Sequence, residues 1–183
     1  YLNTRLSSGM ALEGDAWFMR SDTAGLEGDD ASWGFGVRSP NNQGIRAGFN
    51  YKEVQENFNP AMGFVNNSGI RDYLANVGYS HFFNPGGLLQ QAEFGFDAQR
   101  VNFIDGGLQT EKLRITLIEA NTSSRDSFRI RTAVNKEVVR APFRVYSEPG
   151  RDIFIEPGRY EFNRRGIRMQ TANQRPVSFF LGG

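Results

Sequence analysis

The sequence predicts an all-β protein, an antiparallel up-and-down meander of about ten strands that forms a transmembrane β-barrel or a large part of one. Three observations support this prediction. Apolar and polar residues alternate with a period of two in nearly every segment between turn signals. Short and long connections alternate along the chain. Aromatic residues reach 13% and glycine contributes 21 of the 183 residues, which favours sheet over helix.

The first alternating segment covers residues 10–20, in which Glu13 and Asp15 face away from the apolar even positions. Trp17 is an exception, because it shares the parity of Asp15. Two hairpins follow, each with an apolar and a polar face on both strands. The segments and their turns are residues 33–38 and 45–52 around the turn 40–44, then residues 73–80 and 91–99 around the turn 84–87.

Residues 112–117 and 128–137 continue the same alternation, and no segment shows a helical period. The runs reach the 9 to 11 residues or so that cross a bilayer at a tilt, whereas strands of soluble sandwiches average about 5 to 6. Connections near residues 8–9, 40–44, 84–87 and 123–126 are short, and those at residues 21–30, 53–69 and 139–158 are long. Only the link 104–107 is shorter than this scheme expects.

The alternation predicts which side chains face lipid and which face the lumen of the barrel. The predicted lipid-facing residues are Phe18, Phe35, Phe49, Tyr79, Phe94, Phe96 and Phe128. The predicted lumen-facing polar residues are Glu13, Asp15, Arg46, Asp72, Glu93, Asp97, Arg114, Arg129 and Arg131. Charged residues in the middle of successive strands favour a lumen filled by ion pairs over the solvated face of a soluble β-sandwich.

Composition and motifs exclude several chemistries. The chain has no cysteine, which excludes disulfides, thiolate zinc sites and cysteine nucleophiles, and its net charge of +1 does not suit a nucleic-acid-binding protein. The one histidine, His81, has no partner that the sequence would place beside it as a catalytic base. The Glu13–Asp15 pair is interpreted as charge balance in the lumen. We therefore expect no catalytic residue, no metal site and no cofactor.

The loop around residues 56–69 is too apolar to be freely solvated, so we expect it to fold into the lumen as a plug or to pack against a partner. Its plug or docking residues are Phe58, Asn59, Pro60, Gly63 and Phe64. A self-packed loop cap is the plainer alternative.

The same loop carries a family resemblance, in the string Phe58-Asn59-Pro60-Ala61-Met62-Gly63-Phe64-Val65. Together with Gly69-Ile70-Arg71-Asp72-Tyr73 and Ile155-Glu156-Pro157-Gly158-Arg159-Tyr160, it resembles an uncharacterised bacterial family. Such proteins join an N-terminal carbohydrate-binding-like β-sandwich of the family-nine type to a C-terminal outer-membrane-type β-barrel. Residues 1–183 resemble the barrel part only, so the resemblance implies no carbohydrate-binding residue here.

These observations predict a non-catalytic component of the bacterial outer membrane in Gram-negative cells, with a structural, transport or docking role. Its expected partners are the lipid bilayer and the remainder of the same polypeptide or other outer-membrane subunits. The alternative is a soluble, secreted or periplasmic β-sandwich domain that handles carbohydrate. We also expect residues 1–183 to be one barrel segment of a longer polypeptide, because Val177, Phe179 and Leu181 begin a strand that stops at Gly183.

Overall fold

The computed structural model describes residues 2–5, 11–60, 65, 67–148 and 150–183, and these residues form twelve β-strands and no helix. The described residues therefore include no helix that could cross a membrane. The strands are β1 (Leu2–Arg5), β2 (Ala11–Arg20), β3 (Ala31–Arg38), β4 (Gly44–Val54), β5 (Ile70–Phe82), β6 (Leu89–Phe103), β7 (Leu108–Thr122), β8 (Ser127–Val139), β9 (Phe143–Glu148), β10 (Arg151–Ile155), β11 (Gly158–Gln170) and β12 (Phe180–Gly182).

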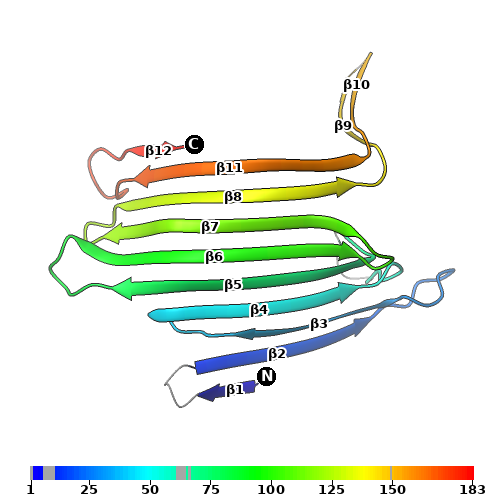
Figure 1. The fold of residues 1–183 in the computed structure, drawn as a ribbon, viewed down its shortest axis with the longest axis horizontal. Coiled ribbons are helices and arrows are strands. Elements are labelled where there is room, and N and C mark those ends of the chain that lie inside the picture. The colour runs from blue at the N-terminus through cyan, green and yellow to red at the C-terminus, as the bar shows by residue number, and fades with distance from the viewer. Residues whose placement is uncertain (1, 6–10, 61–64, 66, 149) are drawn as a thin grey trace.

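Ten of these strands form one antiparallel sheet in the order β1-β2-β3-β4-β5-β6-β7-β8-β11-β12 (Figure 1). Neighbours in the sheet are neighbours in the chain, except where β9 and β10 intervene. Both predicted hairpins are confirmed, since Phe35 pairs with Tyr51 and Val77 pairs with Phe96. The predicted antiparallel meander is therefore the architecture of the protein.

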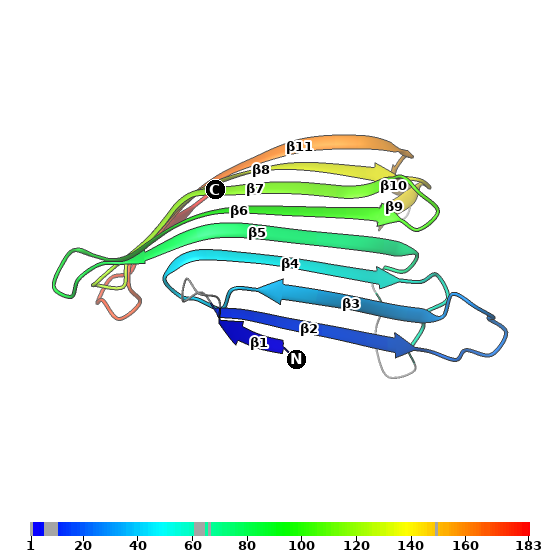
Figure 2. The same ribbon diagram turned by 60° about the horizontal axis from the view of Figure 1, so that its bottom comes forward.

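The sheet is a single curved layer that stays open (Figure 2). Its edge strands, β1 and β12, have one partner strand each, β2 and β11. A closed barrel would require the two edges to pair with each other. The structure thus gives an open antiparallel sheet.

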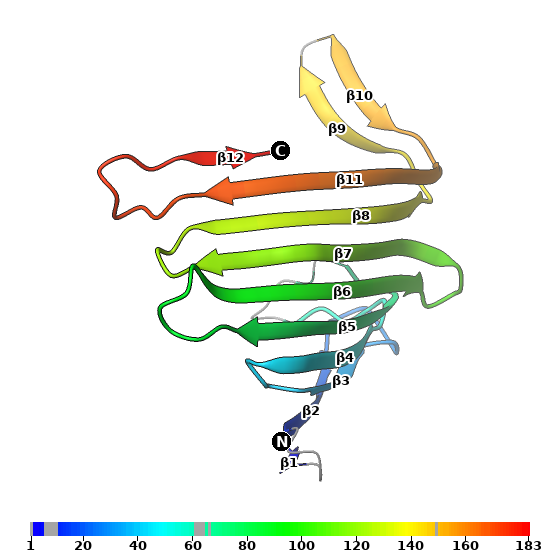
Figure 3. The same ribbon diagram turned by 60° about the vertical axis from the view of Figure 1, so that its left-hand side comes forward.

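The long connection expected at residues 139–158 contains structure that the sequence analysis missed. Strands β9 and β10 pair as a two-stranded ribbon that projects beyond the ends of β8 and β11 (Figure 3). The ribbon turns at Gly150, whose φ of 84° favours glycine. The two strands of the ribbon are short, and nearly all of their side chains are exposed on both faces. The sequence therefore lacks the buried–exposed alternation that would distinguish them from a loop.

Trp17, the exception to the alternation, lies against a glycine on the neighbouring strand. Gly34 is the direct partner of Trp17, and a Cβ atom at Gly34 would stand 2.9 Å from the indole ring. It would also stand 2.6 Å from the backbone oxygen of Tyr51. The indole therefore occupies the space that the glycine leaves on the polar face of the sheet, as aromatic residues do across from strand glycines.

This close packing makes Gly34→Ala destabilising, by about 1 to 3 kcal/mol, because the new methyl group collides with backbone that cannot move aside. Gly95→Ala is the matched control: it lies on the same face, and its Cβ would meet nothing closer than 3.8 Å. Chemical denaturation of both variants measures the difference. Equal free energies of unfolding would contradict the close contact at Gly34.

Candidate functional site

The register divides the sheet into a polar and an apolar face, because directly paired residues point to the same side. Strand-to-strand pairs such as Asp97 with Arg114 and Glu119 with Arg129 extend one face across the sheet. All nine predicted lumen-facing residues lie on the polar face, and all seven predicted lipid-facing residues lie on the apolar face. That the two faces meet lumen and lipid stays a prediction.

Ion pairs connect neighbouring strands along the polar face. Arg38 binds Glu13 at 3.0 Å, and Lys52 lies 3.5 Å from Asp72. Asp72 also accepts a hydrogen bond from Gln99 at 3.0 Å. Arg46 and Glu93 form an ion pair between β4 and β6, which are not adjacent in the sheet. Arg129 and Glu119 form one between the adjacent strands β8 and β7. Of the nine predicted residues, Asp15, Asp97, Arg114 and Arg131 form no ion pair with another described residue.

A hollow of about 400 Å³ lies on the polar face over strands β3 to β7. Charged groups of both signs line it, among them Arg38, Arg46, Glu93, Asp97 and Glu119. Ser80, beside Glu93, is fully buried and accepts a hydrogen bond from Gln91 at 3.0 Å. The arrangement suits water and small polar solutes, since it offers both donors and acceptors and its lining is more polar than apolar.

The apolar face is exposed along most of the sheet. Phe18 is 68% exposed, Ile45 is 55% exposed and Phe94 is 47% exposed, because no second layer of the described residues covers them. Toward the long-loop end, the rings of Trp33, Tyr51 and Tyr73 form a row with centroids 4.9 and 5.0 Å apart. Aromatic rows with polar tips are typical of the boundary between membrane and water.

This pattern ends at β11. Glu161 pairs with Lys136, Asn163 pairs with Val134 and Arg165 pairs with Thr132, so three polar side chains of β11 lie on the same face as the exposed phenylalanines. Two ion pairs also lie on that face at the long-loop end: Arg71 donates a hydrogen bond to Glu53 at 2.8 Å, and Lys136 donates one to Glu111 at 2.8 Å. Sequence alternation missed both groups, although the charges at these apolar-parity positions could have indicated them.

The loop between β4 and β5 folds over the polar face. Phe58 is 6% exposed and packs with Val54, Ile70 and Val101, three residues on the polar face of β4, β5 and β6. Val65, from the far side of the loop, packs against the same cluster. This cluster is the main buried apolar core among the described residues, so the loop is held by hydrophobic contact and not by its ends alone.

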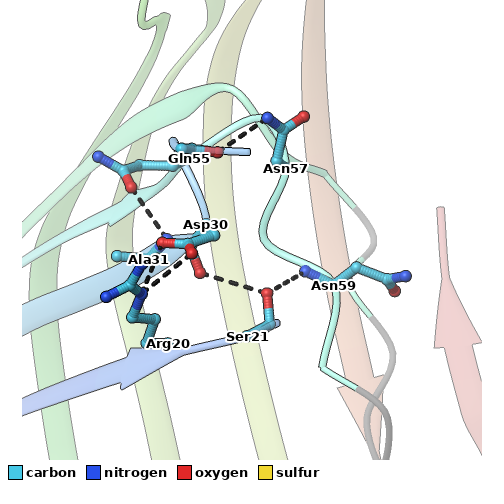
Figure 4. A network of polar contacts seen from close by, with 8 residues as sticks. Arg20, Ser21, Asp30, Ala31, Gln55, Asn57 and Asn59 are labelled. Atoms are coloured by element: carbon cyan, nitrogen blue, oxygen red, sulfur yellow. Dashed lines mark hydrogen bonds and ion pairs between the residues drawn. The ribbon is translucent and has the colours of Figure 1, made fainter. Parts of the chain in front are cut away.

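Hydrogen bonds tie the same loop to the β2–β3 connection (Figure 4). The backbone N–H of Asn59 donates to Ser21 Oγ at 2.9 Å, and Ser21 Oγ donates to the backbone oxygen of Asp30 at 3.2 Å. Arg20 holds Asp30 through an ion pair of 3.0 Å. The hydroxyl group of Ser21 thereby joins the two loops, although Ser21 and Asn59 lie 38 residues apart in the chain.

Amide side chains complete this junction (Figure 4). Asn57 Nδ2 donates to the backbone oxygen of Gly28 at 2.8 Å. The backbone N–H of Asn57 donates to the backbone oxygen of Asp29 at 2.9 Å. The N–H of Ala31 donates to Gln55 Oε1 at 2.9 Å. Polar backbone groups of both loops are thus satisfied by each other, which fixes the position of the loop that carries Phe58.

The structure describes three of the five predicted plug or docking residues. Phe58 is buried, Asn59 is in the junction and Pro60 is half-buried, whereas Gly63 and Phe64 lie outside the described residues. Phe58 lies on the polar face, as a plug would. Whether the loop plugs a lumen or docks a partner stays a prediction.

The remaining candidates show no catalytic or metal-binding arrangement in the part of the chain that the structure describes. His81 lies on the apolar face with its ring 4.8 Å from that of Phe83. The described residues contain no group of three or more His, Cys, Asp or Glu side chains that could hold a metal ion. The arrangement offers binding and packing surfaces.

The β6–β7 connection carries a separate clasp. Arg140 binds both carboxylate oxygens of Asp105, at 2.8 and 2.7 Å, and its guanidinium lies 3.6 Å from the centroid of the Phe103 ring. Hydrogen bonds from Arg140 lower the pKa of Asp105 below its ordinary value of 3.8.

No protein-family model, curated protein or solved structure matches the chain. The resemblance drawn from the loop string stays a prediction.

Phe58→Ala should detach the loop from the polar face, because truncating a buried phenylalanine costs about 3 to 5 kcal/mol. The measurement is amide hydrogen exchange at Asn57 and Asn59, whose N–H groups bond to the β2–β3 connection. Leu26→Ala, at a residue 45% exposed in that connection, is the control and should leave both amides protected. Unchanged protection in Phe58→Ala would show that Phe58 does not hold the loop.

Arg140→Gln should return the pKa of Asp105 toward 3.8. The pKa of Asp105 is lower in the folded than in the unfolded state. The stabilisation by the clasp is therefore fully present at a pH above the unfolded-state pKa, and it is lost as the pH falls through the folded-state pKa. An NMR titration of the Asp105 carboxyl carbon measures this pKa in the parent chain and in Arg140→Gln. Arg144→Gln, which removes a partner of Asp152 in the ribbon, is the control. An identical Asp105 titration in Arg140→Gln and the parent chain would mean that the clasp is absent in solution.

Proposed function

We propose that this chain forms part of the wall of a β-barrel in the outer membrane of Gram-negative bacteria, with a structural, transport or docking role and no catalytic chemistry. One observation carries the proposal: a single-layered sheet has one face that is apolar and exposed over its middle, with ion pairs only toward the long-loop end, and a second face that carries a network of ion pairs across its strands. A sheet in water has to bury its apolar face against another layer. In a lipid bilayer the apolar face contacts the lipid chains, so the sheet needs no second layer.

Strand length supports the same proposal. Strands β5, β6, β7 and β8 contain 13 to 15 residues each. About 9 to 11 residues are enough to cross a bilayer at the usual tilt, so these strands would extend beyond it at their ends. The row of Trp33, Tyr51 and Tyr73 would then lie at the boundary between lipid and water on the long-loop side.

The polar face would line the interior of the barrel. Phe58 and the loop that carries it would narrow this interior from one end, because they cover the polar ends of β4, β5 and β6. This placement favours the plug role of the loop over docking of an outside partner. Transport would then pass over the charged hollow beside it.

A protein partner, either more of the same polypeptide or another outer-membrane subunit, would complete the wall beside β11. Backbone hydrogen bonds join β11 to the β12 segment from Ile167 to Thr171. Among the described residues, positions 158–166 of β11 pair with β8 alone, and that edge offers its backbone groups to another strand. Asn163 and Arg165 on the apolar face of β11 also suit contact with protein better than contact with lipid tails.

The alternative, a soluble carbohydrate-handling β-sandwich, has less support. A sandwich packs two sheets about 10 Å apart through their inner faces. The described residues form one large sheet, and their buried apolar cluster contains Val54, Phe58, Ile70 and Val101. The ribbon of β9 and β10 is too small to be a second layer.

Two arginine substitutions on β5 test the membrane proposal. Val77 lies on the apolar face and is 49% exposed, whereas Leu74 lies on the polar face and is 38% exposed. Val77→Arg should cost about 2 to 4 kcal/mol near the middle of the bilayer, and Leu74→Arg should cost much less. The measurement is folding into phospholipid vesicles, followed by the heat-dependent gel mobility typical of closed barrels.

The two variants are matched in strand, exposure and introduced charge, so only the face differs. In a soluble protein both would be tolerated alike, since both side chains already meet water. Equal assembly of the two variants, or folding of the parent chain without detergent or lipid, would reject the outer-membrane proposal.

A further inference from the structure

Three arginines gather on the polar face where β8 meets β11. Arg129 is the direct cross-strand partner of Arg168, and Arg131 follows two residues after Arg129 on the same face. Directly opposite residues have Cβ atoms about 5 Å apart, and diagonal ones about 7 to 8 Å. All three line a hollow of about 260 Å³ beside β12.

Positive charge exceeds negative charge in this hollow. Arg129 binds Glu119, whereas Arg131 and Arg168 form no ion pair with another described residue. Three guanidinium groups line the hollow, and a described carboxylate is paired with only one of them, Arg129. Like charges directly opposite each other destabilise a sheet, so Arg129 and Arg168 would gain from a bound anion between them.

Neighbouring groups position the arginines and shape the hollow. The guanidinium of Arg168 lies 5.0 Å from the centroid of the Phe180 ring, a cation–π contact that orients it. Gly166, the partner of Arg131, allows the end of the β12 segment to approach closely, since a Cβ there would stand 3.1 Å from the backbone oxygen of Gly183. The Nε of Arg129 is buried without a hydrogen-bond partner, which leaves a donor to be satisfied.

We propose that Arg129, Arg131 and Arg168 form a binding site for a small, doubly charged oxyanion of the phosphate type that reaches the polar face from solution. Guanidinium groups bind tetrahedral oxyanions through paired, charge-assisted hydrogen bonds. Arg131 and Arg168, which form no ion pair with another described residue, supply positive charge for the dianion. This site goes beyond the proposed membrane role and does not depend on it, because the polar face is the same in either setting.

Calorimetric titration of the chain with inorganic phosphate at pH 8 and constant ionic strength tests the proposal. The double variant Arg131→Gln/Arg168→Gln should bind phosphate at least about tenfold more weakly, since two of the three charged donors are lost. Arg151→Gln, at an exposed arginine of the ribbon, is the control and should bind as the parent chain does. Circular dichroism checks that each variant keeps its strands.

Arg168→Lys provides a second variant that keeps the charge but loses the planar pair of donors, and it should weaken phosphate binding by less than the double variant does. Equal binding by the parent chain and the double variant would overturn the site. Chloride that displaces phosphate at equal concentration would also overturn it, because the effect would then be unspecific screening.

A phosphate group is also present in lipid headgroups, so a second titration uses vesicles of phosphatidylcholine with phosphatidylglycerol. If the chain binds free phosphate equally well in the presence of these vesicles, the result supports a soluble ligand on the polar face. Vesicle binding that depends on Arg131 and Arg168, with no binding of free phosphate, would overturn the soluble ligand. If Val77→Arg did not impair membrane assembly, the membrane proposal would fail, but the measured binding of phosphate would still test the arginine site.

Discussion

The register of one antiparallel ladder determines almost every other feature of this protein. Because side chains alternate across a strand, pairing Tyr51 with Tyr73 and Asp97 with Arg114 decides at once which residues share a face. A shift of one residue between two strands would place carboxylates among the exposed phenylalanines. The ion pairs between neighbouring strands, such as Arg38 with Glu13, work against such a shift.

A single layer also explains where the stabilising contacts lie. The sheet cannot build a core between two layers, so apolar burial is concentrated where the β4–β5 loop brings Phe58 onto Val54, Ile70 and Val101. Hydrogen bonds through Ser21 then hold that loop against the β2–β3 connection. The long-loop end is therefore the most constrained part of the molecule among the described residues.

Charge is distributed unevenly over the polar face. Toward β2 to β6 carboxylates such as Asp15 and Asp97 outnumber the bases, and toward β8 and β11 arginines predominate. An oxyanion moving over this face would be drawn toward the arginine cluster and away from the acidic strands. The phosphate-type site and the hollow beside Glu93 would then be two ends of one charged surface.

The sequence by itself determined the fold class, the two faces and the short and long connections, because a period of two and turn residues are local signals. It indicated that Phe58 would be buried, since an apolar loop needs a partner surface. Only the tertiary structure decided which surface Phe58 covers, why Trp17 stands opposite Gly34, and that Arg129 meets Arg168. It also decided that the sheet is open and that residues 143–155 form a ribbon. These features depend on which strands pair and in which register, and pairing between distant segments leaves no local pattern in the chain.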